Sequence, residues 1–342
     1  MFIPGSNAEQ AQAAGGDDAA SLPAGYRIEH KAMATLWELY AFGDPGHDCE
    51  HAAELAFETI DQVERRLSYF LPDSDIGELN RAAAAEPVLL SPDARACLDL
   101  VDRVRELTGG AFDPTVGALL SGRKPWHLAD TLPPEGTPPG EAQPNRLGFQ
   151  AIERSPDGTQ AARLSDQVEL DLGAIGKGFG VDRALSVVAE WLEGGVMLVA
   201  GKSTMGALGP APGEAGGWPI GIRDPRDEAT ALDTIALPAG DTPIAVSAAA
   251  GGESGHVLDP RTCQPATAAI GAWAVAPSGA LSDGLATAAL VMSEAQVIAC
   301  CEADPTLAIA RLTRDGRFQT FGRWSALRDT LAGPAEADEA EG

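Results

Sequence analysis

Basic side chains are scarce in this sequence. Lys and Arg together number 24 against 50 Asp and Glu, so the formal net charge at neutral pH is −26. Lysine occurs at four positions only, namely Lys31, Lys124, Lys177 and Lys202. Because nucleic-acid phosphates are bound by clustered Lys and Arg, the composition argues against nucleic acid as a partner.

Long apolar runs and paired cysteines are missing as well. No stretch approaches the roughly 18 consecutive apolar residues of a membrane-spanning helix, and the N-terminus lacks the basic start and apolar core of a signal peptide. We therefore expect a cytoplasmic protein without a membrane span, in which residues 1–26 form a flexible lead. The five cysteines form no Cys-x-x-Cys pair and are odd in number, which argues against a disulfide framework and a zinc site.

What remains is an ordinary globular composition, with 44% hydrophobic and 22% charged residues over 342 positions. Apolar residues recur at helical spacing in residues 50–68 and 92–108, and the second run is bounded by Ser91 as N-cap and by Gly109 as stop signal. Further helices are expected at residues 178–193 and 282–292, and strands at residues 33–42, 167–172, 196–200, 218–222, 243–246, 270–275 and 307–313. This mixture predicts an α+β domain with a mixed sheet.

The connections between these elements carry their own signals. The Pro- and Gly-rich residues 121–145 are expected to form a surface connection, because such residues interrupt helices and strands. Asp315-Gly316 is typical of a hairpin turn. Residues 331–342 are expected to be an acidic, disordered tail.

Four segments place polar or charged residues beside glycines at the ends of apolar runs, where backbone can approach a ligand. They are residues 109–115 (GGAFDPT), 171–180 (DLGAIGKGFG), 256–262 (HVLDPRT) and 282–288 (SDGLATA). The second runs directly into a predicted helix, and free N–H groups at a helix N-terminus favour an anion such as phosphate. Its glycine spacing matches neither G-x-G-x-x-G nor a P-loop. Anion binding and a tight, glycine-capped turn are both consistent with it.

The last two segments carry groups suited to proton transfer and to metal binding. His256 is close in sequence to Asp259, and a neighbouring carboxylate orients an imidazole and lets it act as a base near neutral pH. The alternative is a structural histidine. Asp283 and Thr287 are four residues apart, so on a helix they share one face and can reach one hard cation such as Mg²⁺. The alternative there is that Asp283 caps the helix N-terminus.

Together and in this order, the segments resemble the ApbE family of FAD:protein FMN transferases, from about residue 31 to residue 322. Residues 33–35 (MAT) are similar to the family's M-G-T, residues 68–80 (SYFLPDSDIGELN) to S-x-x-x-P-x-S-(D/E)-(I/L)-x-x-(I/L)-N, and residues 108–115 to T-x-G-A-F-D-P-T. Residues 171–178 are similar to D-L-G-(G/A)-I-A-K-G, residues 256–262 to H-I-I-D-P-R-T, and residues 283–287 to D-A-L-A-T. Each match is weak alone, but six matches in register are specific.

The resemblance implies a T-fold-like α+β enzyme with mixed sheets packed against helices, and a single catalytic domain over residues 27–330. Such an enzyme transfers the FMN half of FAD to a Thr or Ser of an acceptor protein, releases AMP and uses Mg²⁺. FAD would be bound by Met33, Tyr69, Ala111, Phe112, Asp113, Asp171, Lys177 and Leu258. Asp283, Thr287 and the backbone carbonyl of Ala174 would hold Mg²⁺, and His256 would be the base. Acceptors in the family are often redox proteins, which implies the same kind of partner here.

Two segments depart from the family pattern. Residues 199–203 (VAGKS) stand where the family has N-A-G-G-D, so that Lys202 replaces a glycine and Ser203 an acid. Lys202 either adds a phosphate contact or obstructs the backbone approach that glycine allows. Residues 247–253 (SAAAGGE) replace a T-S-G-D-Y-type stretch. Two alternatives to transfer therefore stay open: hydrolysis of FAD to FMN and AMP, and flavin binding without catalysis.

Overall fold

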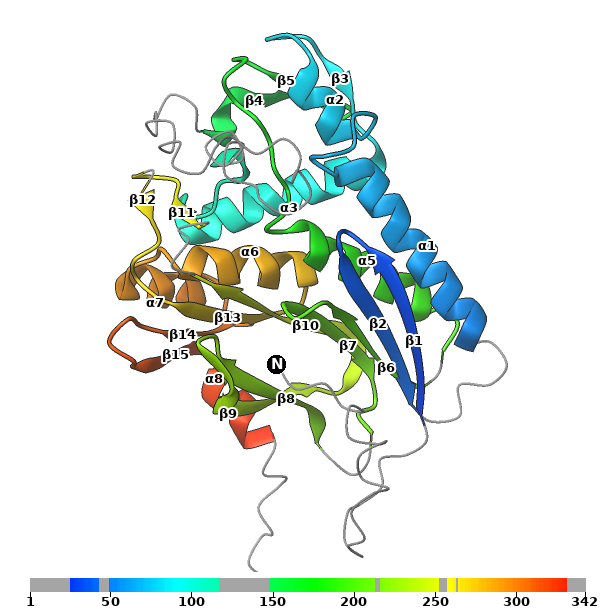
Figure 1. Cartoon of the computed structure of the whole chain (residues 1–342), viewed down its shortest axis with the longest axis vertical. Coiled ribbons are helices and arrows are strands. Elements are labelled where there is room, and N and C mark those ends of the chain that lie inside the picture. The colour runs from blue at the N-terminus through cyan, green and yellow to red at the C-terminus, as the bar shows by residue number, and fades with distance from the viewer. Residues whose placement is uncertain are drawn as a thin grey trace, which may run out of the picture.

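The computed structural model describes residues 25–42, 49–116, 148–192, 194–212, 216–251, 257–262 and 264–330. Its centre is an eight-stranded sheet in the order β1-β2-β6-β7-β10-β13-β14-β15 (Figure 1). These strands are β1 (Gly25–Ala32), β2 (Thr35–Phe42), β6 (Gly195–Ala200), β7 (Thr204–Gly209), β10 (Gly240–Ala250), β13 (Gly271–Ala276), β14 (Ala308–Leu312) and β15 (Phe318–Gly322). Every pairing between them is antiparallel.

Helices cover one face of this sheet. They are α1 (Cys49–Leu67), α5 (Gly176–Val188), α6 (Gly279–Ala289) and α7 (Glu294–Ala303). Helix α5 contacts both α1 and α6, while α6 lies against β10 and β13. The core between α1, α5 and the strands includes Trp37, Ile60, Leu185 and Leu198, all fully buried. We call this side of the sheet the helical face.

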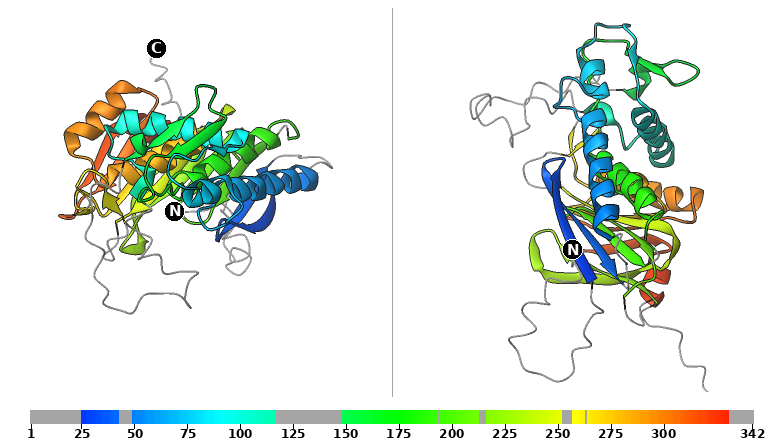
Figure 2. Two further views of the ribbon diagram at one scale, coloured as in Figure 1. Left: turned by 90° about the horizontal axis from the view of Figure 1, so that it is seen from above. Right: turned by 90° about the vertical axis from the view of Figure 1, so that its right-hand side faces the viewer.

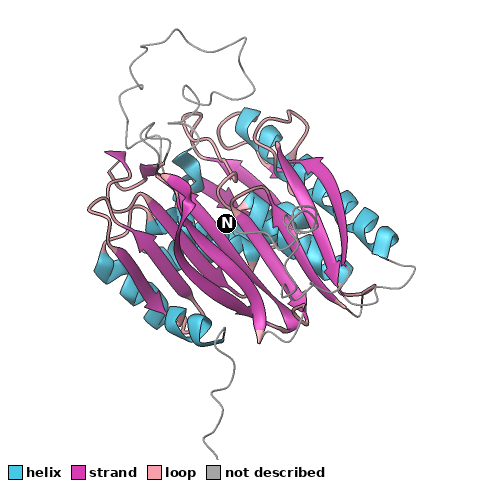
Figure 3. Cartoon of the chain, turned by 60° about the horizontal axis from the view of Figure 1, so that its bottom comes forward, coloured by secondary structure: helices cyan, strands magenta, loops and turns pink. Residues whose placement is uncertain are grey.

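A hairpin and a short helix cover the opposite face. The hairpin pairs β8 (Gly217–Asp224) with β9 (Asp227–Pro238), and the helix is α8 (Trp324–Asp329). Figure 3, turned so that the bottom of Figure 1 comes forward, shows strands in front and helices largely behind them. Trp218, Ile220 and Trp324 are fully buried in the apolar cluster on this side, which we call the hairpin face.

A smaller group of elements extends the molecule along its long axis, above the helical face (Figures 1 and 2). It contains α2 (Asp75–Arg81), α3 (Pro92–Thr108), β3 (Val88–Leu89), β4 (Ile152–Arg154) and β5 (Gln160–Arg163), with the 3₁₀ turns η3 (Pro114–Val116) and η5 (Phe149–Ala151). Arg163 is almost fully buried, and its guanidinium donates to the carbonyls of Leu79 (2.8 Å), Ala82 (2.6 Å) and Val168 (2.7 Å). The Arg163 side chain of β5 therefore binds the backbone at the end of α2 and the backbone at Val168. A further two-stranded hairpin pairs β11 (Leu258–Asp259) with β12 (Gln264–Pro265).

The α+β class expected from the sequence is confirmed, and so are most of the predicted elements. The sheet is not mixed as expected, because every strand pairing in the described ranges is antiparallel. Helix α3 has the predicted ends: the Ser91 hydroxyl accepts from Ala94 N at 3.2 Å, and Gly109 adopts a left-handed conformation with φ 58°. The turn at Gly316, with φ 83°, joins β14 to β15 as predicted. None of the helices in the described ranges is long and apolar enough to cross a membrane. Residues 1–24 of the predicted lead, the connection at 121–145 and the tail at 331–342 lie outside the described residues. The last two residues of the predicted lead, 25 and 26, begin strand β1 instead, so the lead was predicted too long.

The strand expected at residues 167–172 is wrong. That segment forms no strand in the described structure, and its backbone bonds a side chain and a turn instead of a neighbouring strand. The side-chain amide of Asn80 both accepts from Leu170 N and donates to Leu170 O, each at 2.8 Å. Asp171 N donates to Pro114 O at 2.8 Å. A side chain from α2 therefore satisfies the backbone that periodicity alone had assigned to a sheet.

Candidate active site

The N-termini of α5 and α6 cross in direct backbone contact. A Cβ on Gly178 would lie 1.9 Å from the carbonyl oxygen of Gly279, and a Cβ on Gly279 would lie 2.4 Å from that of Gly178. Real Cβ atoms do not approach backbone so closely, so only glycine allows this crossing. It brings the glycine-rich segment 171–180 against the helix that carries Asp283. We call this contact the α5–α6 crossing.

Each helix at the crossing supplies a carboxylate to the first turn of the other. Asp283 of α6 accepts a hydrogen bond from Gly178 N of α5 at 3.1 Å. Asp182 of α5 accepts from Gly279 N (2.5 Å), from Ala280 N (3.0 Å) and from the Ser278 hydroxyl (2.6 Å). Burial raises the pKa of the Asp182 carboxyl even though these donors act to lower it. The unpaired N–H groups that begin every helix are thus partly satisfied by the neighbouring helix.

The first turn of α5 leaves backbone groups without partners inside the helix. Gly178 is the third residue of α5, so its N–H is one of the donors that find no acceptor within the helix, and Asp283 satisfies it. Within the described ranges, the Ala174 carbonyl accepts no hydrogen bond and Lys177 N donates none. An acceptor and a donor at the start of α5 are therefore available to a ligand.

Asp283 combines near-complete burial with an incompletely satisfied carboxylate. The residue is 4% exposed, and Gly178 is the only described residue that donates a hydrogen bond to it. It is not the cap of its own helix, because α6 begins at Gly279 with Ser278 as N-cap. Thr287 follows one turn later on α6 and is partly exposed. The predicted shared helix is confirmed, and the alternative that Asp283 caps it is wrong.

These oxygens fit a hard cation. Asp283, Thr287 and the Ala174 carbonyl would supply carboxylate, hydroxyl and carbonyl oxygens, which are the ligand types that Mg²⁺ takes in proteins. A buried carboxylate without enough donors is costly unless a cation or further hydrogen bonds satisfy it. Nowhere in the described ranges do three or more His, Cys, Asp or Glu side chains gather as a metal cluster. A cation held here would therefore complete its coordination with water or with oxygens of a ligand.

Tyr69 and Asp171 meet beside the crossing. The Tyr69 hydroxyl donates to Glu169 Oε2 at 2.6 Å. Burial, the hydrogen bond to Glu169 and the nearby carboxylate of Asp171 raise the pKa of Tyr69 well above its usual value. Tyr69 is therefore a neutral, aromatic group at physiological pH. Asp171 Oδ1 accepts from Gly173 N at 2.9 Å, which shapes the turn before α5.

Residues 111–113 are joined to this turn through the backbone, since Asp171 N bonds Pro114 O. Ala111 and Phe112 are each 3% exposed. The Asp113 carboxylate accepts from Thr115 N (2.9 Å), from the Thr115 hydroxyl (2.6 Å) and from Phe149 N (3.1 Å), and it lies 3.5 Å from Arg105. Its oxygens are thus occupied by protein donors, so Asp113 shapes the loop.

The predicted residues Met33 and Lys177 lie at the start of α5. Met33 and Ala34 form the two-residue turn between β1 and β2, with φ 48° and 55°. The Met33 methyl carbon lies 3.4 Å from the point where a Cβ of Gly180 would be. Lys177 Nζ donates to Gly173 O at 3.4 Å. Both side chains therefore lie beside the N-terminal part of α5.

Lys202 neither enters the crossing nor blocks it. It lies in the turn between β6 and β7, beside the β1–β2 turn, since Gly201 N donates to Leu36 O at 2.8 Å. Its ammonium group bonds Glu228 of β9 at 3.0 Å, and the side chain is 83% exposed. An exposed ion pair of this kind contributes little to stability.

Leu258 lies on a separate hairpin, with 7% of its surface exposed. Arg261 holds that hairpin in place by bonding Asp259 and the carbonyl of Val291 (2.9 Å), just after α6. Burial opposes ionisation of Asp259, but the hydrogen bonds from Arg261 outweigh it, and the pKa of Asp259 is lowered. His256, the predicted base, lies outside the described residues.

Several groups at the crossing were not found from the sequence. Asp182 and Glu169 lie outside the motifs, and Ser247 and Ser282 lie in segments that were singled out without a role for these two residues. The hydroxyls of Ser247 and Ser282 are 2.8 Å apart and fully buried, and Ser282 also donates to Gly279 O at 2.9 Å. Ser247 belongs to the segment that departs from the family pattern, and it fastens α6 to β10.

Comparisons with known proteins identify the family of the chain. The ApbE family model matches residues 33–310. The FAD:protein FMN transferase of Vibrio cholerae is 28% identical over 301 residues, which are 83% of this chain and 86% of that relative. The FAD:protein FMN transferase of Chlamydia muridarum is 32% identical over 193 residues, 53% of this chain and 58% of that relative.

Solved structures show the same fold. The ApbE protein of Thermotoga maritima aligns with a TM-score of 0.77 at 22% identity and covers 89% of this chain and 99% of its own. The flavin transferase ApbE from Vibrio cholerae aligns with a TM-score of 0.75, again at 22% identity, with the same coverage of 89% and 99%.

Proposed function

The chain belongs to the ApbE family, and on that premise we propose that it transfers the FMN half of FAD to a Thr or Ser hydroxyl of an acceptor protein. Its relatives along most of the chain bear the name FAD:protein FMN transferase. The observation that carries the proposal is the hydrogen bond from Gly178 N to Asp283. It holds a carboxylate at the start of α5, where the Ala174 carbonyl also accepts no hydrogen bond in the described structure.

The reaction exchanges one phosphoester for another. The acceptor hydroxyl oxygen forms a bond to the phosphorus on the FMN side of the diphosphate, and the bond from that phosphorus to the bridging oxygen breaks. AMP leaves with the bridging oxygen, and the hydroxyl proton passes to a base. We assign that base to His256, whose sequence neighbours Asp259 and Arg261 hold their hairpin against the segment after α6.

The residues at the crossing supply binding and charge. Asp283, Thr287 and the Ala174 carbonyl would hold Mg²⁺, which neutralises charge that develops on the diphosphate oxygens. Lys177 adds a positive charge and a free N–H at the start of α5, both of which favour a phosphate. A net charge of −26 is compatible with a diphosphate because these groups shield it locally.

The remaining predicted residues would bind the rest of FAD. Met33 and neutral Tyr69 offer apolar and aromatic surface beside the first turn of α5. Ala111, Phe112, Asp113, Asp171 and Leu258 are assigned to the same ligand by the family pattern. The acceptor is a protein that presents a Thr or Ser hydroxyl, and we propose that it is a redox protein that gains a covalent flavin.

One incubation tests this function. The full chain is mixed with FAD, Mg²⁺ and an acceptor protein that bears a known flavinylation motif, and the acceptor mass and the nucleotide products are measured. The proposal predicts an acceptor heavier by one FMN and AMP released in equal amount, with both lost when the cation is chelated. Free FMN and AMP with an unmodified acceptor indicate hydrolysis, and bound but intact FAD indicates a flavin-binding protein; either result contradicts transfer.

A further inference from the structure

We infer that Asp182 is a positioning residue for this reaction, which holds the first turn of α6 against α5 and thereby sets the place of Asp283. The inference rests on the proposed function, since it assigns Asp283 to the cation. Asp182 itself faces the N-terminus of α6 and touches no group that reacts. Its effect is carried by the backbone of α6.

The hydrogen bonds of Asp182 exceed what helix capping requires. Ser278 already caps α6, because its hydroxyl oxygen accepts from Leu281 N at 3.4 Å. Asp182 accepts three further hydrogen bonds from the same turn, donated by Ser278, Gly279 and Ala280, all within 3.0 Å. It does so from another helix, 96 to 98 positions earlier in the chain. The contact therefore fixes one helix relative to the other.

The position of α6 in turn sets two candidate cation ligands at once, because Asp283 and Thr287 both lie on this helix. With α6 in place, Gly178 N in the first turn of α5 donates to Asp283 at 3.1 Å. Loss of Asp182 would thus displace Asp283 and Thr287 together, relative to the segment that carries Ala174.

The glycine contact makes this arrangement sensitive to small displacements. Because Gly178 and Gly279 meet backbone to backbone, neither residue has a side chain that could hold the spacing of the helices at this point. The hydrogen bonds of Asp182 to α6 and of Asp283 to α5 join the two helices there. Removal of Asp182 leaves Asp283 as the one carboxylate that bonds across the crossing in the described structure.

The test measures Mn²⁺ binding directly, with Mn²⁺ as the probe and the electron paramagnetic resonance signal of the free ion as the readout. Asp182→Asn keeps the size of the side chain but replaces an acceptor oxygen by a donor amide. We expect it to weaken Mn²⁺ binding by about 10-fold or more, the usual effect of removing an outer partner of a metal ligand. In turnover, the Mg²⁺ concentration for half-maximal rate should rise, while KM for FAD changes little.

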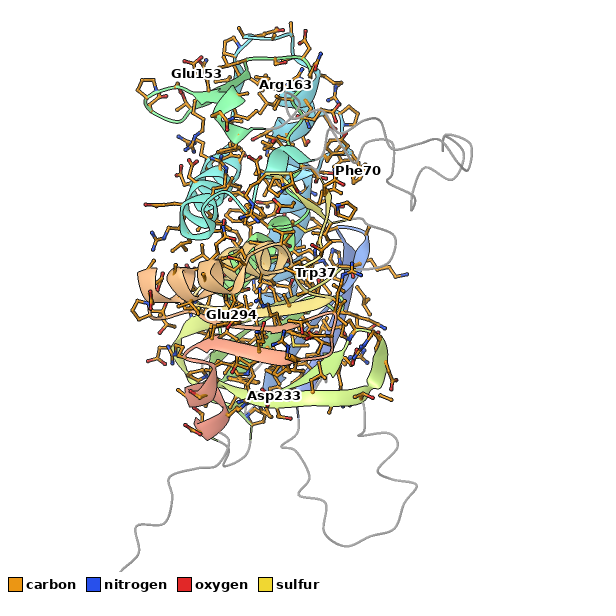
Figure 4. All side chains as sticks on the ribbon, turned by 90° about the vertical axis from the view of Figure 1, so that its left-hand side faces the viewer. Trp37, Phe70, Glu153, Arg163, Asp233 and Glu294 are labelled. Atoms are coloured by element: carbon orange, nitrogen blue, oxygen red, sulfur yellow. The ribbon has the colours of Figure 1, made fainter. Side chains whose placement is uncertain are left out.

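The matched control is Asp233→Asn. Asp233 is also an acidic residue that accepts hydrogen bonds from a helix, through Trp324 Nε1 and Arg328 Nε, both at 2.8 Å. Figure 4 shows it at the end of the molecule opposite Arg163 and Glu153, on the hairpin face. Asp233→Asn should lower the melting temperature and leave Mn²⁺ affinity unchanged.

A second pair of variants tests the hydrogen bond from Ser278 to Asp182 without changing any charge. Ser278→Ala loses the hydroxyl that Asp182 accepts from, and Ser278→Thr keeps it. We expect weaker Mn²⁺ binding in Ser278→Ala and near-native binding in Ser278→Thr. This pair also decides the question if Asp182→Asn does not fold.

The outcomes separate the inference from the function. Native Mn²⁺ affinity in Asp182→Asn or in Ser278→Ala overturns the inference, as does a wild-type protein that binds no Mn²⁺. A wild-type protein that binds Mn²⁺ and responds to these variants, but transfers no FMN, supports the inference and contradicts the proposed function.

Discussion

The two faces of the central sheet differ in what they bury. On the hairpin face, Trp218 and Trp324 are fully buried in a cluster of aromatic and aliphatic side chains. The helical face has an apolar core of its own, but its α5–α6 crossing also contains the carboxylates of Asp182 and Asp283 beside two glycines that meet backbone to backbone. Buried apolar area stabilises a fold, whereas buried carboxylates lower stability unless they are satisfied. The polar groups of the candidate site are therefore confined to one helix contact on one face.

The largest effect should follow from Asp283→Ala. The variant removes the only carboxylate among the proposed cation ligands, and neutralisation of diphosphate charge contributes several kcal/mol, so turnover should fall by about 10³-fold or more. FMN transfer to the acceptor is the measurement, with Asp233→Asn on the hairpin face as the control that stays active. Full activity in Asp283→Ala would remove the basis for placing the cation at the crossing.

His256→Asn should slow transfer by about 10² to 10⁴, the range expected for loss of a general base. FAD affinity, measured by equilibrium binding, should change little, because the imidazole is assigned to the acceptor proton. A fall in FAD affinity in step with the rate would make His256 a binding residue instead.

On the hairpin face, Trp324→Ala should lower the free energy of unfolding by about 3 to 5 kcal/mol, because it empties a fully buried aromatic position. Denaturant unfolding measures the loss. At a temperature where the variant stays folded, its kcat should match that of the native protein. A large fall in kcat at that temperature would show that packing on the hairpin face affects the site on the helical face, contrary to the difference drawn between them.

At the crossing, Gly178→Ala should lower the free energy of unfolding by about 3 kcal/mol, because its Cβ would meet the Gly279 carbonyl at 1.9 Å. Gly176→Ala, two residues earlier in the same helix, is the matched control. No atom lies within 4 Å of a Cβ at Gly176, so that change should be neutral or stabilise by up to about 1 kcal/mol. Equal stability of the two variants would contradict the close backbone contact.

The smallest effect concerns the β1–β2 turn. Ala34 has φ 55°, a left-handed conformation that glycine adopts without steric penalty. Ala34→Gly should therefore raise the free energy of unfolding by up to about 1 kcal/mol. Ala85→Gly, at φ 65° in another turn, should stabilise by a similar amount. A loss of stability in both would mean that chain entropy outweighs the conformational strain.

The elements that local signals define were predicted well from the sequence. Helix α3 has an N-cap serine at Ser91, apolar residues on one face and a glycine stop at Gly109, so its ends follow from neighbouring residues. Residues 167–172 were assigned to a strand because periodicity cannot show that Asn80, some 90 positions away, supplies the partner. Helix α5 begins at Gly176, two residues before the predicted start at residue 178. The prediction was late because glycine lowers helix propensity, although Gly176 lies in the first turn.

The site was predicted as a set of motifs and not as an arrangement. The shared helix face of Asp283 and Thr287 follows from their spacing, and the structure has both on α6. The hydrogen bond that places Asp283 at the start of α5 joins residues 105 positions apart. Asp182 looks like an ordinary charged residue of an amphipathic helix, and only the packing of α6 against it shows its partners. Such long-range contacts have no local sequence signal.

If the proposed function is correct, the α5–α6 crossing holds the cation and the diphosphate of FAD. A crystal of the protein soaked with FAD and Mn²⁺ tests this placement, because anomalous scattering locates the metal. We predict a peak bound by Asp283, Thr287 and the carbonyl of Ala174, with the diphosphate beside the first turn of α5. A metal bound elsewhere, or FAD bound away from this turn, would contradict the account.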